Sequence, residues 1–554
     1  MNNNFFYLLI AFLLLIYLPI AQGQDTLTVE PFTQDGELNL VRTILGDTSE
    51  NGQRANLQRV YRLKRGAIYL MDQTIFADFP IRMVSENDPS KRPAMLVRGK
   101  FATGDPIKTF FTFTKDGLEH SFSDIIFNGV DEERQYMAQW NRGLKISGSN
   151  ISLTLQKCIM NAWAGLFLEI TGDDASLYIR DSKWRNGVGS QAPPWGAQQT
   201  VFFAKYIKNL IVTNNTFFNT GGFWLFQEDG IAENVIVEHN TLFTSAIDLH
   251  RMRDLVNAKF RSNIYYGTHA YGQSPSELAA AWFDKDKQVI SMFSIDTTGS
   301  DLLKSKSLKE SDKKITCSHN VYFSPKIMTD WWSANPTLNK PIWMHSRTQN
   351  MFNDNSNYPY LVEMENSNQN PNFVDTQMEN WVVTELIKYC DNTRKSKPLS
   401  NRNYDVFKGI QDVLMVPWPL PENLVYTNAE MLVGGHDGLP VGDLNWYPDQ
   451  RKLYQETMVN VSDTGIAENL DMIQSITPNP SNDRILVAFN DEIFKKESDI
   501  LIINSEGKTI WRSSINLNST FEPIHIDITS FNAGVYYLRV ETKNGTETKK
   551  FVKL

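Results

Sequence analysis

Residues 210–217 read LIVTNNTF and residues 235–242 read VIVEHNTL, and this repeated pattern decides the fold. Counted from Asn215 and Asn240 as position zero, positions −5, −3 and +2 are apolar in both segments. The alternation at −5 and −3 has the period of a β-strand, and the step to +2 implies a bend at position zero that keeps both flanking strands facing inward. The pattern therefore predicts pairs of short strands joined by a bend.

The template fits six segments, of which the one containing Ala258 is the weakest match. Their position-zero residues are Cys158, Ser182, Asn215, Asn240, Asn263 and Asn320, with an earlier candidate at Ile125. A basic spacing of about 24 residues with loop insertions is typical of a β-solenoid, in which each coil stacks on the one before. The step from Asn263 to Asn320 is more than twice as long, which leaves room for two coils and a loop. We expect the stacked asparagines to bond to one another and to the backbone of the bend, which is a structural role.

Length and composition narrow the class of protein. The chain has 554 residues, too many for one compact core, and its 41% hydrophobic and 21% charged residues exclude global disorder. The net charge of −9 argues against a nucleic-acid partner, although a local basic groove for an acidic sugar polymer is compatible with it. Cys158, Cys317 and Cys390 are too few and too scattered for a disulfide framework or a zinc site, and are expected to be small core residues.

The N-terminus predicts a secretory signal peptide over residues 1–23. An apolar run from Phe5 to Ala21 is followed by Ala21-Gln22-Gly23, which has the small-x-small pattern of a cleavage site. No Lys or Arg precedes the run, so an uncleaved anchor is the alternative. The run is short for a spanning helix, and after cleavage we expect no transmembrane segment.

The remaining chain divides into four parts. Residues 24–117 are expected to form an N-terminal cap and the first coils, and residues 118–375 the core of a parallel β-helix with loop insertions. The insertion beginning Ser274-Pro275-Ser276-Glu277 has the signature of a helix N-terminus, whereas Lys326 to Tyr360 is typical of a long surface loop. Residues 376–470 are expected to be a loop-rich extension with a short helix at Asn380 to Tyr389 and a linker.

From Ile476 onward, short alternating strands separated by turns such as Ser505-Glu506-Gly507 and Asn544-Gly545 predict a small β-sandwich over residues 476–554. This segment resembles the C-terminal sorting domain of type IX secretion cargo in Bacteroidetes-type bacteria. The resemblance is carried by Pro478-Asn479-Pro480, by Ala533-Gly534-Val535-Tyr536-Tyr537 and by the terminal Lys549-Lys550-Phe551-Val552-Lys553-Leu554. It implies a partner, the type IX machinery, and a final location at the cell surface or outside the cell.

The repeat region resembles secreted right-handed parallel β-helix proteins of the pectin-lyase-like superfamily. Asn215-Thr216-Phe217 and Asn240-Thr241-Leu242 carry this resemblance, and the segments Arg59–Gly66 and Asp437–Trp446 look like stretches that recur in type IX-exported β-helix proteins. The superfamily contains lyases, hydrolases, esterases and non-catalytic adhesins. The fold expected here, an all-β solenoid followed by a small sandwich, therefore does not select a reaction.

A cluster at Asp248–Asp254 is the candidate for chemistry. Strand alternation would place His250 on one side and Arg251 and Arg253 on the other. A uronate lyase needs a cation to neutralise the substrate carboxylate and a base for the C5 proton, roles that Arg251, Arg253 and His250 could fill. The acidic residues Glu228, Asp229 and Asp248 could hold Ca²⁺. The alternative is that these charged residues only form ion pairs with one another on a solvent-exposed face and have no functional role.

Glycoside hydrolysis by paired carboxylates is the competing chemistry. The pair Glu228-Asp229 lies one coil before Asp248, so the two coils would together provide two acids, one from each coil. The polygalacturonase type also carries a Gly-His-Gly motif, which this chain lacks, and its Asp173-Asp174 pair lies in a turn that begins with glycine. If the chain is an enzyme, a polysaccharide lyase is favoured over a hydrolase.

Tryptophans in loops are candidates for sugar binding. Trp195, Trp331, Trp332 and Trp343 lie in stretches rich in Pro, Asn or Gly. Exposed aromatic rings can stack on sugar faces, but they can equally pack loops against the solenoid. The sequence thus predicts a secreted or surface β-helix that engages extracellular polysaccharide, with a non-catalytic adhesin or structural surface protein as the alternative.

Overall fold

The computed structural model describes residues 25–554 apart from 101–103, 137–141, 164, 188–198, 204, 223–224, 228–229, 248–249, 252–253, 281–289, 400–401, 463–472, 478, 490–497, 505–507, 516–523 and 543–544. The predicted signal peptide, residues 1–23, lies outside the described residues.

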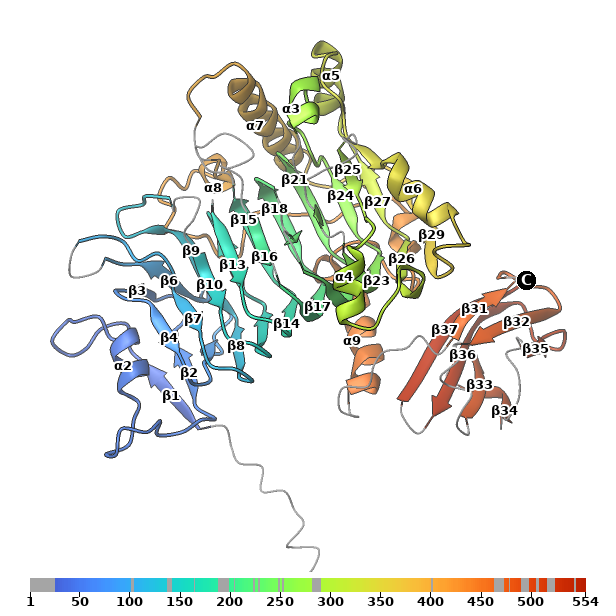
Figure 1. The fold of residues 1–554 in the computed structure, drawn as a ribbon, viewed down its shortest axis with the longest axis horizontal. Helices are drawn as coiled ribbons and strands as arrows, with labels where there is room; N and C mark the ends of the chain where they lie inside the picture. Colours follow the sequence, from blue (N-terminus) through green and yellow to red (C-terminus); the bar gives the residue numbers. More distant parts are fainter. Residues whose placement is uncertain are drawn as a thin grey trace, which may run out of the picture.

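Three parallel sheets stack coil upon coil into a β-helix, which confirms the expected fold class (Figure 1). From β2 to β22 each coil contributes one strand to sheet I, turns sharply into sheet II, crosses a loop into sheet III and returns to sheet I. Among the described residues, the later coils have strands in sheets I and II but not in sheet III. All strand pairs within these sheets are parallel. In sheet I, for example, Leu210 of one coil lies beside Val235 of the next.

The strands of sheet I, in order of pairing, are β1 (Thr26–Val29), β2 (Val60–Leu63), β5 (Arg82–Ser85), β8 (Glu119–Ser123), β11 (Ser152–Gln156), β14 (Ala175–Arg180), β17 (Ile207–Thr213), β20 (Ala232–Glu238), β23 (Leu255–Arg261), β26 (Lys314–Ser318) and β29 (Leu361–Met364). Those of sheet II are β3 (Ile68–Met71), β6 (Ala94–Arg98), β9 (Ile125–Asp131), β12 (Ile159–Asn161), β15 (Lys183–Gly187), β18 (Thr216–Thr220), β21 (Thr241–Ser245), β24 (Ile264–Tyr266), β27 (Val321–Phe323) and β30 (Ser367–Asn368). Those of sheet III are β4 (Ile75–Ala77), β7 (Phe111–Phe113), β10 (Arg142–Ile146), β13 (Leu166–Ile170), β16 (Gln199–Phe203), β19 (Leu225–Gln227) and β22 (His250–Arg251).

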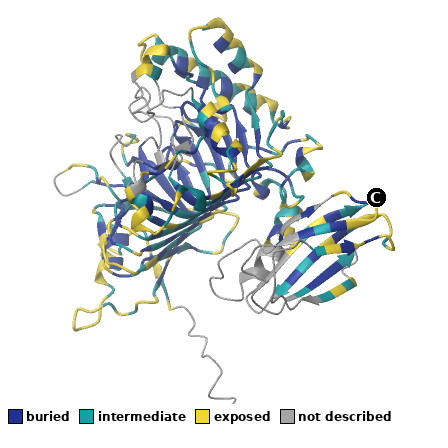
Figure 2. Ribbon diagram, turned by 45° about the vertical axis from the view of Figure 1, so that its right-hand side comes forward, coloured by how far each residue is buried: buried dark blue, intermediate teal, exposed yellow. Residues whose placement is uncertain are grey.

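The template residues line the interior of the solenoid. Leu210, Val212 and Phe217 are all buried, as are their counterparts in the neighbouring coils. Figure 2 shows many buried residues along the stacked strands. Two aromatic rings at position +2 of neighbouring coils, Trp184 and Phe217, stack nearly parallel with 4.8 Å between ring centroids. Burial of this continuous apolar column is the main stabilising contribution to the stack.

The bend lies one residue before the position we predicted. The residues preceding position zero have left-handed backbone conformations, with φ of 56° at Asn214, 51° at His239 and 55° at Ser262. Asn, Asp and His adopt this conformation more readily than other residues with a side chain, so Asn214 and His239 suit the bend, whereas Ser262 is less favoured there. Position zero itself is the first residue after the turn, and its side chain points into the solenoid.

The predicted ladder of position-zero asparagines is present. Asn215 Nδ2 donates to Asn240 Oδ1 (2.9 Å), Asn240 Nδ2 to Asn263 Oδ1 (2.9 Å) and Asn263 Nδ2 to Asn320 Oδ1 (3.0 Å). The ladder continues from Asn320 to Asn366 (2.9 Å), a rung that the template missed because positions −3 and +2 are polar there. Each amide also donates to backbone carbonyls at the bend, so the buried polar groups of the turn are paired.

A second, outer ladder follows the solvent-facing side of sheet I. Asn234 Nδ2 donates to Asn209 Oδ1 and Asn257 Nδ2 donates to Asn234 Oδ1, both at 3.3 Å, while Asn209 donates to Ser176. These side chains are only partly buried, unlike the inner ladder.

The step from Asn263 to Asn320 holds a single coil with a large insertion, so our prediction of two coils was wrong. Strand β23 pairs directly with β26, and the two asparagines bond to each other. The predicted helix cap is correct, since Ser274 N donates to Glu277 Oε2 (2.7 Å) and Glu277 N to Ser274 Oγ (3.2 Å). The described part of this insertion contains α3 (Pro275–Ala280), β25 (Ser291–Phe293), α4 (Ser300–Ser305) and η1 (Glu310–Asp312).

The stretch Lys326 to Tyr360, which we expected to be a loop, contains α5 (Lys326–Ala334), β28 (Ile342–Met344) and α6 (Ser346–Asn353). Helix α5 buries Met328 and Trp332 four residues apart, on one face. We expected a loop because the stretch is rich in Trp, Pro and Asn, but Met328 and Trp332 give this helix an apolar side that packs inward.

Residues 370–462, here called the extension, run back along the outer face of sheet II. Helix α7 (Thr376–Arg394) packs its buried face, which includes Met378 and Val382, against the outward-facing Phe218, Phe243 and Tyr266. Further on, apolar residues around Val413 cover the first coils. The chain then runs back along the row of bends between sheets I and II, where Gly442 N donates to Ser262 O. The other described helical elements of the extension are α8 (Tyr404–Phe407), η2 (Met431–Val433), η3 (Leu444–Trp446) and α9 (Pro448–Ser462). As predicted, all three cysteines are buried and free.

A buried ion cluster fastens the extension to sheet II. The Arg185 guanidinium on β15 is fully buried and donates to both carboxylate oxygens of Asp405 (Nη1 to Oδ2, 2.8 Å) and of Glu422 (Nε to Oε1, 3.1 Å; Nη2 to Oε2, 2.9 Å). Burial alone would lower the pKa of Arg185, but the two carboxylates outweigh it and raise the pKa.

The C-terminal residues form the expected small β-sandwich. One antiparallel sheet contains β31 (Ile473–Thr477), β32 (Arg484–Phe489) and β35 (Ile524–Asp527), and the other contains β33 (Ser498–Asn504), β34 (Thr509–Ile515), β36 (Gly534–Thr542) and β37 (Gly545–Lys553). Its core, which includes Ile485, Ile502 and Leu538, is separate from that of the solenoid (Figure 1).

Candidate functional site

The left-handed bend residues form a polar row along the outside of the solenoid, and the returning part of the extension binds to it. Asn214 O accepts a hydrogen bond from Asn445 Nδ2 (2.9 Å), and Asp181 Oδ1 pairs with Arg451 (2.5 Å). His239 and Ser262 lie in the same row between these contacts and the end of the stack. The candidate site lies where these two residues meet the extension.

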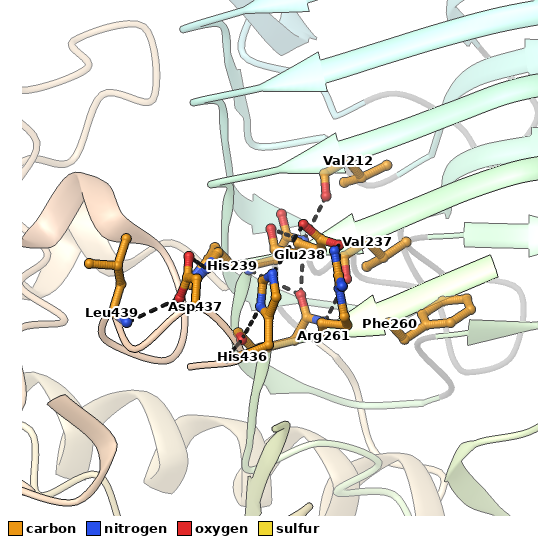
Figure 3. A network of polar contacts seen from close by, with 12 residues as sticks. Val212, Val237, Glu238, His239, Phe260, Arg261, His436, Asp437 and Leu439 are labelled. Carbon is orange, nitrogen blue, oxygen red and sulfur yellow. Dashed lines mark hydrogen bonds and ion pairs between the residues drawn. The ribbon is translucent and has the colours of Figure 1, made fainter. Parts of the chain in front are cut away.

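His239 is held by both of its ring nitrogens (Figure 3). Its Nδ1 lies 3.1 Å from Pro440 O, and its Nε2 lies 3.0 Å from Asp437 Oδ2. The imidazole is fully buried, whereas the Asp437 side chain is 26% exposed and so borders solvent. The ring therefore bridges the β-helix and the extension.

His436 approaches the same point from the extension. Its Nδ1 lies 2.8 Å from Ser262 Oγ, which also accepts from the His436 backbone N–H (2.9 Å), and its Nε2 lies 3.9 Å from Glu238 Oε2. One ligand atom each of His239, His436 and Asp437 lies within 4.8 Å of the others, a grouping of metal-ligand type that is unique within the described residues.

The charges around this cluster are complementary. Burial pulls the pKa of His239 down, but Asp437 outweighs burial and raises it above its ordinary value. Burial would raise the pKa of Asp437, yet His239 and His436 hold it well below its ordinary range. Burial and then the nearby Arg261 lower the pKa of His436, while Arg261 itself is paired to Glu238 (Nε to Oε1, 2.7 Å).

Two glycines let the loop of residues 435–442 lie against the coil. A Cβ on Gly435 would lie 2.5 Å from Leu439 O and 2.9 Å from Asp437 Oδ1. Gly442 has φ +88°, and a Cβ there would lie 2.6 Å from Thr241 Oγ1. Both positions exclude a side chain, so the loop is shaped to bring His436 and Asp437 to the bend.

The sequence did not predict this site. Of the three clustered residues only Asp437 lies in the segment Asp437–Trp446, which we singled out for its resemblance, and His239 is 198 positions away from Asp437. The neighbouring His436-Asp437 pair within a glycine-rich stretch was the local signal, but the sequence offers no way to pair it with His239.

Two of the predicted lyase residues, His250 and Arg251, lie at the far end of sheet III. They form β22, where Arg251 is in register with Phe226 and His250 with Leu225. Arg253 and the proposed calcium ligands Glu228, Asp229 and Asp248 lie outside the described residues, so their geometry stays a prediction.

The four candidate tryptophans occupy different environments. Trp332 is buried and its Nε1 donates to Ala270 O (3.1 Å), while Trp331 beside it on α5 is half-buried. Trp343 stacks on Tyr322 with ring centroids 4.8 Å apart. Trp195 lies outside the described residues. For Trp332 and Trp343 the visible contacts are packing contacts within the protein.

Comparison with known proteins identifies one part of the chain. Residues 475–554 match the family described as "Secretion system C-terminal sorting domain". None of the curated proteins compared with the chain matches it. Within the described residues, the longest and most apolar helices still fall short of what a membrane crossing requires.

The fold and this match together define the class of protein. It is a secreted β-helix protein whose C-terminal domain directs it to the type IX secretion machinery. Its destination is the cell surface or the extracellular space.

Proposed function

We propose that this secreted protein engages extracellular polysaccharide along the outer face of sheet III. The observation that carries the proposal is a row of residues in register across sheet III, one per coil. The row consists of Phe76, Thr112, Lys145, Glu169, Phe202, Phe226 and Arg251.

The spacing of the row suits a linear polymer. Neighbouring strands lie about 4.8 Å apart, which matches one register position to roughly each sugar of an extended chain. Within the row, Thr112 and Glu169 are buried, and Phe202 packs against the apolar cluster around Trp332. Phe76 is exposed and Lys145 half-buried, so these two members are open to a polymer. Phe76 is 67% exposed, and an exposed ring offers apolar contact to sugar C–H groups. An export route that ends outside the cell brings the protein to such polymers.

The charges in the row suit an acidic polymer. Glu169 accepts from Arg142 (Nη2 to Oε1, 2.8 Å) and lies 3.1 Å from Lys145 Nζ. Two cations around one carboxylate leave local positive charge, which a uronate carboxyl group could share. This is the local basic surface that an acidic chain needs in order to bind an acidic polymer.

A uronate lyase is the more specific candidate, and the register of Arg251 favours it. Arg251 continues the row at its end, so it could neutralise a substrate carboxylate, with His250 or Arg253 as the base and Ca²⁺ held by Glu228, Asp229 and Asp248. A non-catalytic adhesin would use the same face without needing these groups to converge.

The test is an incubation of the mature protein with pectate, alginate and neutral glycans, with and without Ca²⁺. Unsaturated products that absorb in the ultraviolet would support the lyase, and binding without unsaturated products or new reducing ends would support the adhesin. Absence of binding to every glycan would overturn the proposal.

Single-residue variants test whether the outer face of sheet III is the binding face. Lys145→Ala and Arg251→Ala should each weaken binding to acidic glycans by about tenfold, the loss expected for a charge-assisted hydrogen bond. Arg180→Ala is the matched control, because Arg180 is an exposed arginine on the outer face of sheet I. Equal binding by all three variants would show that sheet III is not the binding face.

A further inference from the structure

Each of the two histidines at the bend has one ring nitrogen near a carboxylate, Asp437 for His239 and Glu238 for His436. The other ring nitrogen contacts a neighbouring group that orients the ring. His239 Nδ1 faces a carbonyl oxygen, which can only accept, so this nitrogen carries the proton. His436 Nδ1 faces the Ser262 hydroxyl. Metal-binding histidines are typically fixed in this way, with one nitrogen bonded to a neighbouring group and the other directed at the ion.

The contact between His239 Nε2 and Asp437 Oδ2 requires a positive charge between two electron-rich atoms. At 3.0 Å, a nitrogen lone pair and a carboxylate oxygen repel each other unless a proton or a metal ion lies between them. A proton satisfies these two atoms alone. It does not involve His436, although a ligand atom of His436 lies within 4.8 Å of those of His239 and Asp437.

We propose that His239, His436 and Asp437 form a binding site for a divalent transition-metal ion, with Zn²⁺ as the best match. The site is distinct from the polysaccharide face on sheet III and does not depend on it. The metal would connect the bend of coil β20–β21 to the extension.

The donor set selects the type of metal. Two imidazole nitrogens and one carboxylate oxygen suit Zn²⁺ and its neighbours in the first transition row, whereas Ca²⁺ and Mg²⁺ prefer oxygen ligands throughout. Three protein ligands leave a fourth tetrahedral position for water. The exposed edge of Asp437 gives an ion access from solvent.

The surroundings support a cation at this position. Glu238 is buried beside the cluster, with its Oε2 3.9 Å from His436 Nε2, and it adds negative charge next to the ligands. Arg261 binds the other oxygen of Glu238 and fixes the carboxylate in place. Because Ser262 contacts Nδ1 of His436, Glu238 lies on the Nε2 side of the ring, next to the proposed ion, where its carboxylate attracts a cation.

The function of such a site is to clamp the extension. Because the ligands lie on two segments far apart in sequence, a bound ion adds a further link to a long loop that apolar packing, ion pairs and hydrogen bonds already hold. A ligand that binds only the folded chain stabilises it in proportion to the logarithm of its concentration.

The experiment uses the full chain after removal of metal with a chelator. The protein is dialysed against Zn²⁺ and then against buffer, and bound zinc is measured by atomic emission together with the unfolding temperature. We expect about one Zn²⁺ per chain and a higher unfolding temperature than the chelated protein. Co²⁺ in place of Zn²⁺ should give visible absorption typical of four-coordinate cobalt.

His436→Gln and Asp437→Asn should each weaken zinc binding by at least about tenfold. His525→Gln is the matched control, because His525 is exposed on β35 of the sandwich. Circular dichroism checks that each variant is folded, and the exposed position of Asp437 makes Asp437→Asn the safer of the two.

Two results would overturn the proposal. If the folded protein retains much less than one Zn²⁺ per chain, the cluster is an imidazolium–carboxylate ion pair and nothing more. If both variants bind zinc as well as the unchanged protein does, the ion is held elsewhere.

Discussion

The inner asparagine ladder shows how single residues hold one coil to the next. Asn240 takes part in bonds to both neighbouring coils: its Oδ1 accepts from Asn215, and its Nδ2 donates to Asn263 and to two backbone carbonyls. Its side chain is fully buried, so water cannot replace a lost partner.

Asn240→Ala should therefore lower the free energy of unfolding by about 3 kcal/mol, because it leaves several buried polar groups unpaired. Asn234→Ala on the outer ladder is the control and should cost less than about 1 kcal/mol, since its 3.3 Å bonds are partly exposed to water. Chemical denaturation followed by circular dichroism measures both. Equal losses would mean that the inner ladder contributes no more than a surface bond.

His120 gives the solenoid a dependence on pH. Its ring lies 4.0 Å from that of Phe113, its Nδ1 accepts from Ile81 N (3.2 Å), and burial, helped by Arg82, lowers its pKa to about 3. The folded state thus keeps the ring neutral, whereas the unfolded chain protonates it below about pH 6.5. Stability is retained above that pH and lost progressively as the pH falls toward 3.

At pH 5 the loss from His120 should be about 2 kcal/mol relative to pH 7. His120→Gln removes the titrating group, so the difference in unfolding free energy between pH 7 and pH 5 should shrink by that amount. Denaturation curves of both proteins at the two pH values provide the comparison. An unchanged difference would show that other groups cause the acid sensitivity.

At the scale of elements, the extension is attached to sheet II by apolar packing, buried hydrogen bonds and ion pairs that differ in burial. Arg185 forms a buried cluster with Asp405 and Glu422, while Arg134 and Asp412 (2.8 Å) form an exposed pair across the same interface. Removing one member of a buried cluster leaves charges without partners in a region that excludes water.

Arg185→Met should therefore destabilise the protein by about 3–5 kcal/mol. Arg134→Met should have little effect, because solvent screens that pair in any case. Thermal and denaturant unfolding separate the two outcomes, and limited proteolysis of the extension provides a second readout. A small effect of Arg185→Met would show that apolar packing alone holds the extension.

The solenoid could be predicted from the sequence because its determinants are local. Each coil repeats the same short apolar pattern with a small polar residue at the bend, so the strands, the inward face and the ladder were all visible within about ten residues of each other. Asn366 was missed because residues Glu363 and Asn368 break the apolar pattern in the last coil.

The course of the extension and the cluster at His239 depend on contacts between distant segments. Helix α7 was partly visible as a periodic stretch, but its position on sheet II is set by outward aromatic residues such as Phe243 and Tyr266, which resemble ordinary strand residues in sequence. In the same way, nothing near His239 in sequence indicates that Asp437 will lie beside it.

At the scale of the whole molecule, the C-terminal domain determines where the protein goes. Deleting residues 475–554 should leave the β-helix in the periplasm, because the matched sorting domain is absent. Cell fractionation followed by immunoblotting measures the distribution. The full-length chain is the control, and circular dichroism of the truncated protein checks that it still folds. Truncated protein in the medium would contradict the assignment.

The extension also limits how this molecule can vary in length. In most solenoids each repeat touches only its neighbours, so a repeat can be gained or lost with little consequence. Here a single segment is anchored at Asn128 through Val413, at Arg185 through Asp405 and at His239 through Asp437. An added coil would move these anchor points apart while the segment stayed the same length. We therefore expect natural variants to differ in their loops and to keep the number of coils constant.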